Sequence, residues 1–178
     1  MQELSTEQLV ESFKNGARTL TYVAVLHVIR FLGTLGLAAR AEALGDAWLV
    51  LAHYALLAVG FFLLGRAALK GGKLPVRLGA IALLVIIIGV VYDSMISEEL
   101  GRNILFLVIR GVFLFMLNSA LYAHKQLTIR EPGHIMLHEQ EGNSRMAFLW
   151  LTWGGAGLIL AGLIGPLITL VTSGTFPS

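Results

Sequence analysis

Cysteine is absent from the 178 residues of the sequence. Its absence excludes disulfide bonds, thiolate metal sites, cysteine-held iron–sulfur clusters and catalysis by a thiol. Charged residues are also scarce, at 13% of the chain, about half of their usual share in soluble domains. This scarcity argues against a soluble globular domain and against intrinsic disorder. No run of Lys or Arg could follow a phosphate backbone, so we expect no binding to nucleic acids.

Apolar residues are abundant instead, at 56% of the chain. A membrane-spanning helix needs about 20 predominantly apolar residues in sequence, so this content can fill about five spans. Apolar segments lie at about 19–39, 48–69, 76–96, 103–124 and 146–171. The sequence therefore predicts an all-α integral membrane protein, in which residues 1–178 form a single bundle of five transmembrane helices.

A short amphipathic helix is predicted before the first span, over residues 1–18. Ser5 and Gln8 fit a capping box, a pattern that begins a helix. Charged side chains then follow one stripe, and apolar side chains take the opposite side of the helix. The stripe consists of Glu7, Glu11, Lys14 and Arg18, and the apolar side of Leu9, Val10, Phe13 and Ala17. We expect this helix to lie at the membrane surface and to lead into the first span.

Basic residues in the connectors and at the adjoining ends of the spans are distributed unevenly between the two sides of the predicted bundle. Nine lie in the N-terminal segment and in the second and fourth connectors: Lys14, Arg18, Arg66, Lys70, Lys73, Arg77, Lys125, Arg130 and Arg145. Only Arg40 and Arg102 lie in the first and third connectors. Because cytoplasmic loops are enriched in Lys and Arg, the N-terminus is predicted to be cytoplasmic and the C-terminus outside a plasma (inner) membrane.

The fifth span carries small residues on one face, beside Trp150. These residues share about 80° of the helix surface, and they are Gly154, Gly157, Ala161 and Gly165. Small residues let two backbones approach closely, which favours association of helices in lipid. The pattern predicts a tight helix–helix contact. Its partner is another helix of this chain, an identical copy or a different subunit.

Ionisable residues inside the predicted spans form a second group of candidates. An Arg or Asp at the membrane centre costs about 2.5–3.5 kcal/mol on insertion scales, so such residues persist mainly where they are paired or functional. Helix geometry predicts Arg30 and Arg110 at similar depth in the outer half, with Asp93 within reach of an Arg side chain. We therefore predict an Arg30–Asp93–Arg110 network that joins the first, third and fourth spans.

Two arginines and one aspartate leave one positive charge uncompensated in this network. The interpretations left open are arginines that extend to the membrane surface, an inward-folded Glu98 or Glu99, an acidic residue of a partner subunit, a lipid phosphate, and the propionates of a haem.

The redox interpretation places His27, Arg30 and Arg110 around a b-type haem or a quinone. A bis-histidine haem needs two imidazoles at nearly equal depth. Counting along the helices puts His27 about 18 Å and His53 about 9 Å below the outer ends of their spans, and His124 lies at the cytoplasmic end of the fourth span. This offset argues against a bis-histidine haem within the chain and leaves a haem that His27 shares with another subunit.

The longest connector contains His134 and His138 with Glu139 and Glu141. Histidines at this spacing share a helix face and could bind a divalent metal with a carboxylate. The H-E-x-x-H spacing of zinc proteases is absent, and Glu131-Pro132-Gly133 predicts a turn just before the pair. A solvated loop or a partner-docking segment is the favoured interpretation, and we predict no metal site.

The chain contains no G-x-S-x-G motif, no P-loop and no dinucleotide-binding fingerprint. The favoured function is a non-catalytic accessory or assembly subunit, which packs against other integral membrane subunits and lipids in a larger complex. The first alternative is a redox subunit that helps to bind a haem or a quinone. The second is a small anion transporter or channel that forms a homo-oligomer through the fifth span, with Arg30 and Arg110 selecting the anion.

Overall fold

The computed structural model describes residues 5–42, 44–96, 100–130 and 142–173, which form five α-helices. These are α1 (Thr6–Arg40), α2 (Leu44–Ala68), α3 (Lys73–Ile96), α4 (Leu100–Arg130) and α6 (Gly142–Ser173). All five are long and apolar enough to cross a membrane. The predicted all-α bundle with five spans is confirmed, and the apolar helices indicate a multi-pass membrane protein.

The helices contain the predicted apolar segments with small differences at their ends. Helices α1, α4 and α6 extend past the predicted segment on both sides, and α3 begins earlier than predicted and ends at the predicted residue. Helix α2 ends at Ala68, one residue short of the prediction. The turn that follows α2 contains Gly71 with a φ of 95°. This left-handed conformation favours glycine, because glycine has no Cβ.

The N-terminal amphipathic segment is part of α1, which runs unbroken from Thr6 to Arg40. The Ser5–Gln8 capping box is present: the Gln8 backbone N–H donates to Ser5 Oγ at 3.3 Å, and the Ser5 N–H donates to Gln8 Oε1 at 2.9 Å. The apolar side of this segment is buried against α4, where the Phe13 ring lies 5.3 Å from the His124 ring. The segment is therefore continuous with the first span, and its apolar side contacts protein.

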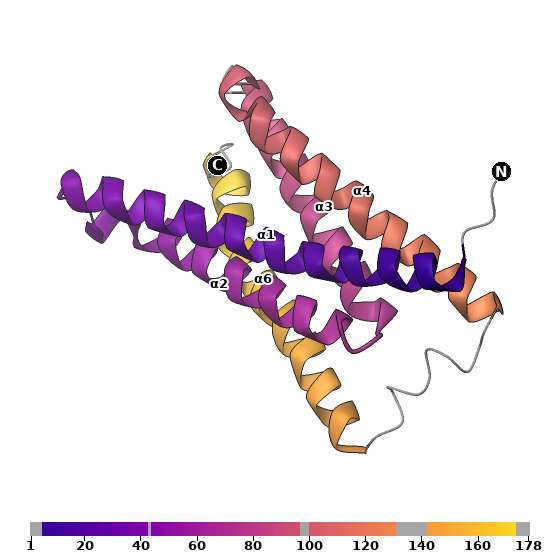
Figure 1. Ribbon diagram of the computed structural model, residues 1–178. Coiled ribbons are helices and arrows are strands. Elements are labelled where there is room, and N and C mark those ends of the chain that lie inside the picture. The colour runs from indigo at the N-terminus through magenta and orange to yellow at the C-terminus, as the bar shows by residue number, and fades with distance from the viewer. Residues whose placement is uncertain (1–4, 43, 97–99, 131–141, 174–178) are drawn as a thin grey trace.

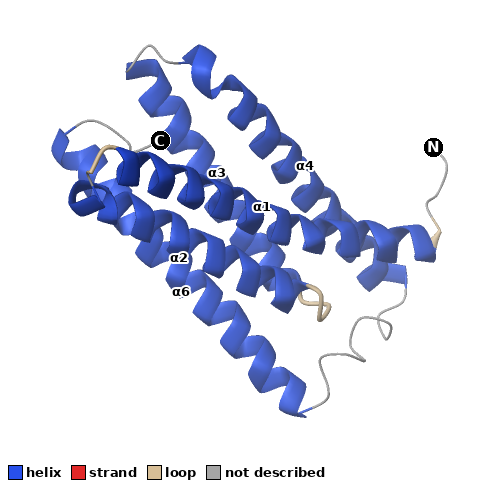
Figure 2. Ribbon diagram, turned by 60° about the vertical axis from the view of Figure 1, so that its left-hand side comes forward, coloured by secondary structure: helices blue, strands red, loops and turns tan. Residues whose placement is uncertain are grey.

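The helices are arranged as two pairs with α6 added to one of them. Helices α1 and α2 pack side by side, and α3 packs on α4 (Figure 1). Helix α2 lies between α1 and α6 (Figure 2). The α1–α2 pair meets the α3–α4 pair near the N-terminal end of α1, and the two pairs diverge toward the opposite end of the bundle.

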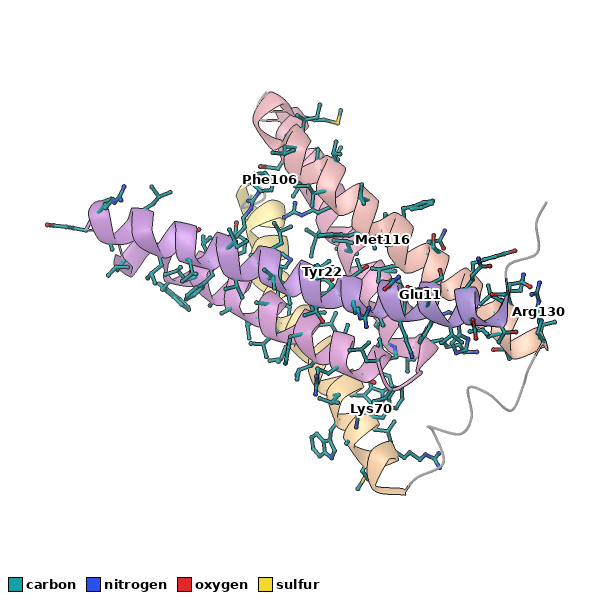
Figure 3. All side chains as sticks on the ribbon, in the orientation of Figure 1. Glu11, Tyr22, Lys70, Phe106, Met116 and Arg130 are labelled. Atoms are coloured by element: carbon teal, nitrogen blue, oxygen red, sulfur yellow. The ribbon has the colours of Figure 1, made fainter. Side chains whose placement is uncertain are left out.

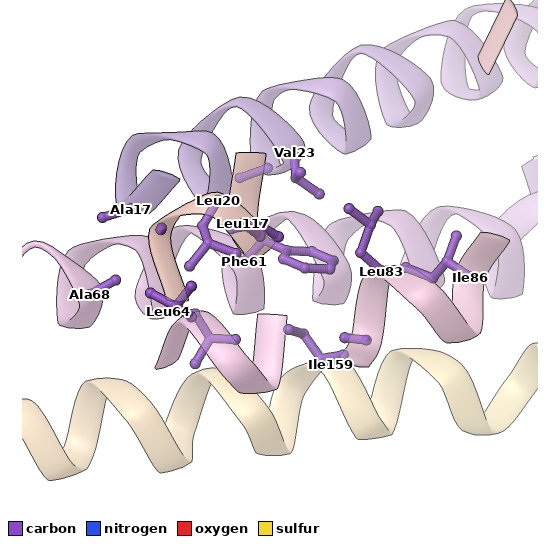
Figure 4. Close-up of a cluster of buried hydrophobic side chains, with 14 of the residues drawn as sticks. Ala17, Leu20, Val23, Phe61, Leu64, Ala68, Leu83, Ile86, Leu117 and Ile159 are labelled. Atoms are coloured by element: carbon purple, nitrogen blue, oxygen red, sulfur yellow. The ribbon is translucent and has the colours of Figure 1, made fainter. Parts of the chain in front are cut away.

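The hydrophobic core lies where the two pairs meet, and every helix contributes to it (Figure 4). Its fully buried members include Leu20 of α1, Phe61 of α2, Leu83 of α3 and Leu117 of α4, and Ile159 of α6 is 3% exposed. Burial of these large side chains supplies the dispersion contacts that hold helices together in lipid.

Glycines permit the closest approaches between helices. A Cβ on Gly16 would collide with the Ala120 side chain of α4, so α1 and α4 meet there with almost no side chain between them. A Cβ on Gly65 would lie 2.8 Å from Thr21 Oγ1, at the contact between α1 and α2. Small residues therefore set the spacing of these two interfaces.

Candidate functional site

Polar side chains from three helices gather inside the membrane-spanning part of the bundle. Helix α1 supplies His27 and Arg30, α2 supplies His53 and Tyr54, and α4 supplies Arg110. We call these five residues the polar cluster. The spacing of His27 and Arg30, three residues apart, places both on one side of α1. The structure thus brings together the three residues predicted as a cofactor site, and it adds two residues of α2.

Arg30 connects α1 to the two neighbouring helices. Its Nη1 donates a hydrogen bond of 3.5 Å to the Tyr54 hydroxyl. Its guanidinium carbon lies 4.1 Å from the ring centre of Phe106, a cation–π contact. Phe106 lies on α4, on the side toward α1 (Figure 3). An aromatic face and a hydroxyl therefore stabilise the Arg30 charge.

His27 is enclosed by aromatic rings and is only 1% exposed. Its ring stacks nearly parallel to Phe61, with centres 5.6 Å apart and an angle of 8° between the planes. The Tyr54 ring lies 6.3 Å away. Among the described residues, neither Nδ1 nor Nε2 of His27 has a hydrogen-bond partner. A buried polar group without a partner costs about 1–3 kcal/mol, so His27 is a destabilising feature of the isolated chain.

His53 has a structural hydrogen bond. Its Nδ1 lies 2.8 Å from the backbone carbonyl oxygen of Gly162. A carbonyl only accepts, so Nδ1 carries the hydrogen and donates it. The bond joins α2 to α6. The rings of His27 and His53 both contact the Tyr54 ring, although the sequence placed the two histidines at different depths.

Arg110 is the most buried charged residue of the polar cluster, at 3% exposed. Within the part of the chain that the structure describes, its Nε and Nη1 lack hydrogen-bond partners, as does Nε of Arg30. The two guanidinium groups are close enough to repel each other electrostatically. Buried charges normally persist with partners. The polar cluster therefore contains more positive charge and more donors than its own members satisfy.

Asp93 is buried on α3 and has interactions of its own. Its participation in a network with Arg30 and Arg110 stays a prediction. The partners that the sequence did not predict are Tyr54, Phe61 and Phe106. They are common aromatic residues in apolar spans, and only the crossing of the helices brings them to the arginines and His27.

The polar cluster does not fit a haem in this arrangement. An axial histidine must direct one ring nitrogen at the iron, with open space for the macrocycle beside it. Both ring nitrogens of His27 are sealed by protein atoms. His124 lies far along α4, where it contacts Phe13 and Thr128. Among the described residues, no three His, Asp or Glu side chains could together hold a metal ion. The pair His134 and His138 lies outside the described residues.

In the described part of the chain, the predicted packing residues of α6 leave space for larger side chains beside them. A Cβ added to Gly154, Gly157 or Gly165 would meet nothing within 4 Å, and Ala161 is exposed. We call these four residues the open face of α6.

Helix α6 packs on α2 through a different face, the closed face, formed by Gly155, Ile159 and Gly162. A Cβ on Gly155 would lie 2.9 Å from the carbonyl oxygen of Gly60. Small residues therefore lie on two faces of α6, and α2 packs against one of them.

Comparisons with protein-family models, curated proteins and solved structures found no match to this chain. Its function must therefore be inferred from the polar cluster and from the open face of α6.

Proposed function

We propose that this protein is a non-catalytic accessory or assembly subunit of a larger membrane complex and that the open face of α6 contacts another subunit. The observation that carries this proposal is the contrast between the two faces of α6. On the closed face, a Cβ added to Gly155 would lie 2.9 Å from the carbonyl oxygen of Gly60 on α2. On the open face, a Cβ added to Gly154 or Gly157 would meet nothing within 4 Å among the described residues.

The physical reason lies in how helices associate in lipid. Lipid tails are as apolar as leucine, so a helix that faces only lipid gains nothing from small residues. Small residues become favourable when a second backbone approaches them closely. Two exposed tryptophans, Trp150 and Trp153, lie on the same helix at 75% and 61% exposed. Aromatic side chains of this size are frequent anchors in interfaces between proteins.

The polar cluster favours a structural role over catalysis or transport. A catalytic or transport site must admit its substrate, whereas His27 and Arg110 are almost completely buried. In this proposal the polar cluster positions α1, α2 and α4 relative to one another. The distribution of basic residues supports an orientation with the N-terminus in the cytoplasm.

The test is affinity purification of the full chain in mild detergent from its native membrane, followed by mass spectrometry. We expect larger membrane subunits to copurify with the wild-type chain and to be reduced at least about tenfold by Gly157→Leu, since a new side chain separates the backbones. The matched control is Gly111→Leu on α4, an exposed glycine whose Cβ would also meet nothing within 4 Å. Recovery of the chain alone, or equal loss of partners in both variants, contradicts the proposal.

A further inference from the structure

A cavity of about 650 Å³ lies between the first turns of α3 and the last turns of α4. This volume is within the usual range of ligand sites, about 300–1,000 Å³. Three cationic side chains line it: Lys73 and Arg77 from α3 and Lys125 from α4. Lys73 and Arg77 are four residues apart and share one side of α3. The polar side chains of Asn118 and Tyr122 complete one wall.

The lining of this cavity has charge of one sign only. No carboxylate of the described residues contributes to it. Lys73, Arg77 and Lys125 are all exposed, so their charged ends can reach a ligand without a change in the backbone. The cavity also adjoins the N-terminal turn of α3, where the helix dipole gives a partial positive charge. All of these groups favour an anion.

The lining is amphipathic along the helix axis. The α4 wall extends from Asn118 to Ile129, a rise of about 16 Å. Leu121 and Ile129 give this wall apolar surface between its polar side chains. A phospholipid offers the same combination, with a charged phosphate beside apolar chains. Basic sites between helices at the cytoplasmic side of a membrane commonly hold such headgroups.

A second cavity on the bundle has a different lining, without the cationic side chains of the first. It has a volume of about 310 Å³ and lies between α1 and α4. Its lining includes Glu11, Gln8 and Asn15 and contains no Lys or Arg. Figure 3 shows Glu11 on the first turns of α1. The two cavities share α4, yet only the one at α3 concentrates positive charge.

We propose that the cavity between α3 and α4 binds a phosphate group, and that Lys73, Arg77 and Lys125 neutralise it. The expected source is the headgroup of an anionic phospholipid in the leaflet at the basic side of the bundle. This site is independent of the open face of α6 and of the proposed partner subunit.

The test is native mass spectrometry of the full chain in detergent with equimolar phosphatidylglycerol and phosphatidylcholine. We expect bound phosphatidylglycerol to exceed phosphatidylcholine at least about fivefold, and Arg77→Gln or Lys125→Gln each to reduce this ratio about fivefold, the effect of about one membrane-surface cation. The matched control for Arg77 is Arg66→Gln, an exposed arginine on the last turn of α2 that does not line the cavity. It should leave the ratio unchanged.

A second arm distinguishes the source of the phosphate. Inorganic phosphate is added to the delipidated chain, and thermal unfolding is measured. A shift for phosphatidylglycerol alone that Arg77→Gln removes identifies the lipid headgroup. A shift with inorganic phosphate that the same variant removes identifies the free anion and also supports phosphate recognition. The proposal is overturned if neither probe binds preferentially, or if Arg66→Gln and Arg77→Gln have equal effects.

Discussion

The two faces of α6 have similar sequences and different surroundings. On the closed face, a Cβ at Gly155 would lie 2.9 Å from Gly60 O, and one at Gly162 would lie 3.3 Å from Leu56 Cβ. On the open face, a Cβ at Gly154 or Gly157 would meet nothing within 4 Å. The pattern of small residues therefore identifies a helix suited to close packing. It does not identify which face packs within the chain.

The largest expected effect is that of Gly155→Leu. The new side chain would be forced against the backbone of α2, and overpacking of this kind costs about 3 kcal/mol of folding free energy. Equilibrium unfolding of the purified chain in detergent measures this loss. The matched control is the neighbouring Gly154→Leu on the open face, which should change the stability by less than about 0.5 kcal/mol. Equal losses in the two variants would remove the distinction between the faces.

Gly16→Ala extends the same comparison to the contact of α1 with α4. The added methyl group would collide with Ala120 and lie 3.0 Å from the carbonyl oxygen of Met116. We expect a loss of about 2 kcal/mol, because two backbones must separate to admit one carbon. Unfolding in detergent again gives the value. A stabilised variant would mean that α1 and α4 are farther apart here than the structure has them.

The five spans could be predicted from the sequence because the length of an apolar run reports directly on its ability to cross a membrane. The capping box at Ser5 could also be predicted, because it depends only on residues close together in the sequence. The burial of Phe13 against His124 could not be predicted, because an apolar stripe has the same pattern whether it faces lipid or another helix.

The candidate site was predictable only in part. Helical periodicity places His27 near Arg30, and counting along the helices placed Arg110 at a similar depth. The structure brings Arg30 and Arg110 within electrostatic range. The contact of Arg30 with Tyr54 depends on how α1 and α2 cross. Apolar spans lack the helical periodicity of polar and apolar residues that would show which face meets which neighbour. Neither the contact of Arg30 with Tyr54 nor the closed face of α6 could therefore be predicted from the sequence.

Arg110→Met tests the polar cluster. The unfilled interactions there are those of buried nitrogen atoms that lack hydrogen-bond acceptors among the described residues. Removing the guanidinium eliminates two buried nitrogens without acceptors and the repulsion with Arg30. Because unsatisfied buried donors are costly, we expect the isolated chain to gain about 1 kcal/mol. The control Arg66→Met, at an exposed position of α2, should change stability by less than about 0.5 kcal/mol. A clear loss of stability in Arg110→Met would instead identify an acceptor for Arg110 within the chain.

The smallest expected effect is that of Gly111→Ala. This is the same change as Gly16→Ala, made at a position where the described neighbours leave room for the added methyl group. Gly111 is exposed on α4, and a Cβ there would meet nothing within 4 Å. Alanine restricts the unfolded chain more than glycine does, so an unhindered helical position should gain about 0.5 kcal/mol. The same change should thus stabilise at Gly111 and destabilise at Gly16, as measured by unfolding in detergent. A loss at Gly111 would indicate that a neighbour covers this part of α4, and Gly111 would then cease to be a valid control for the open face of α6.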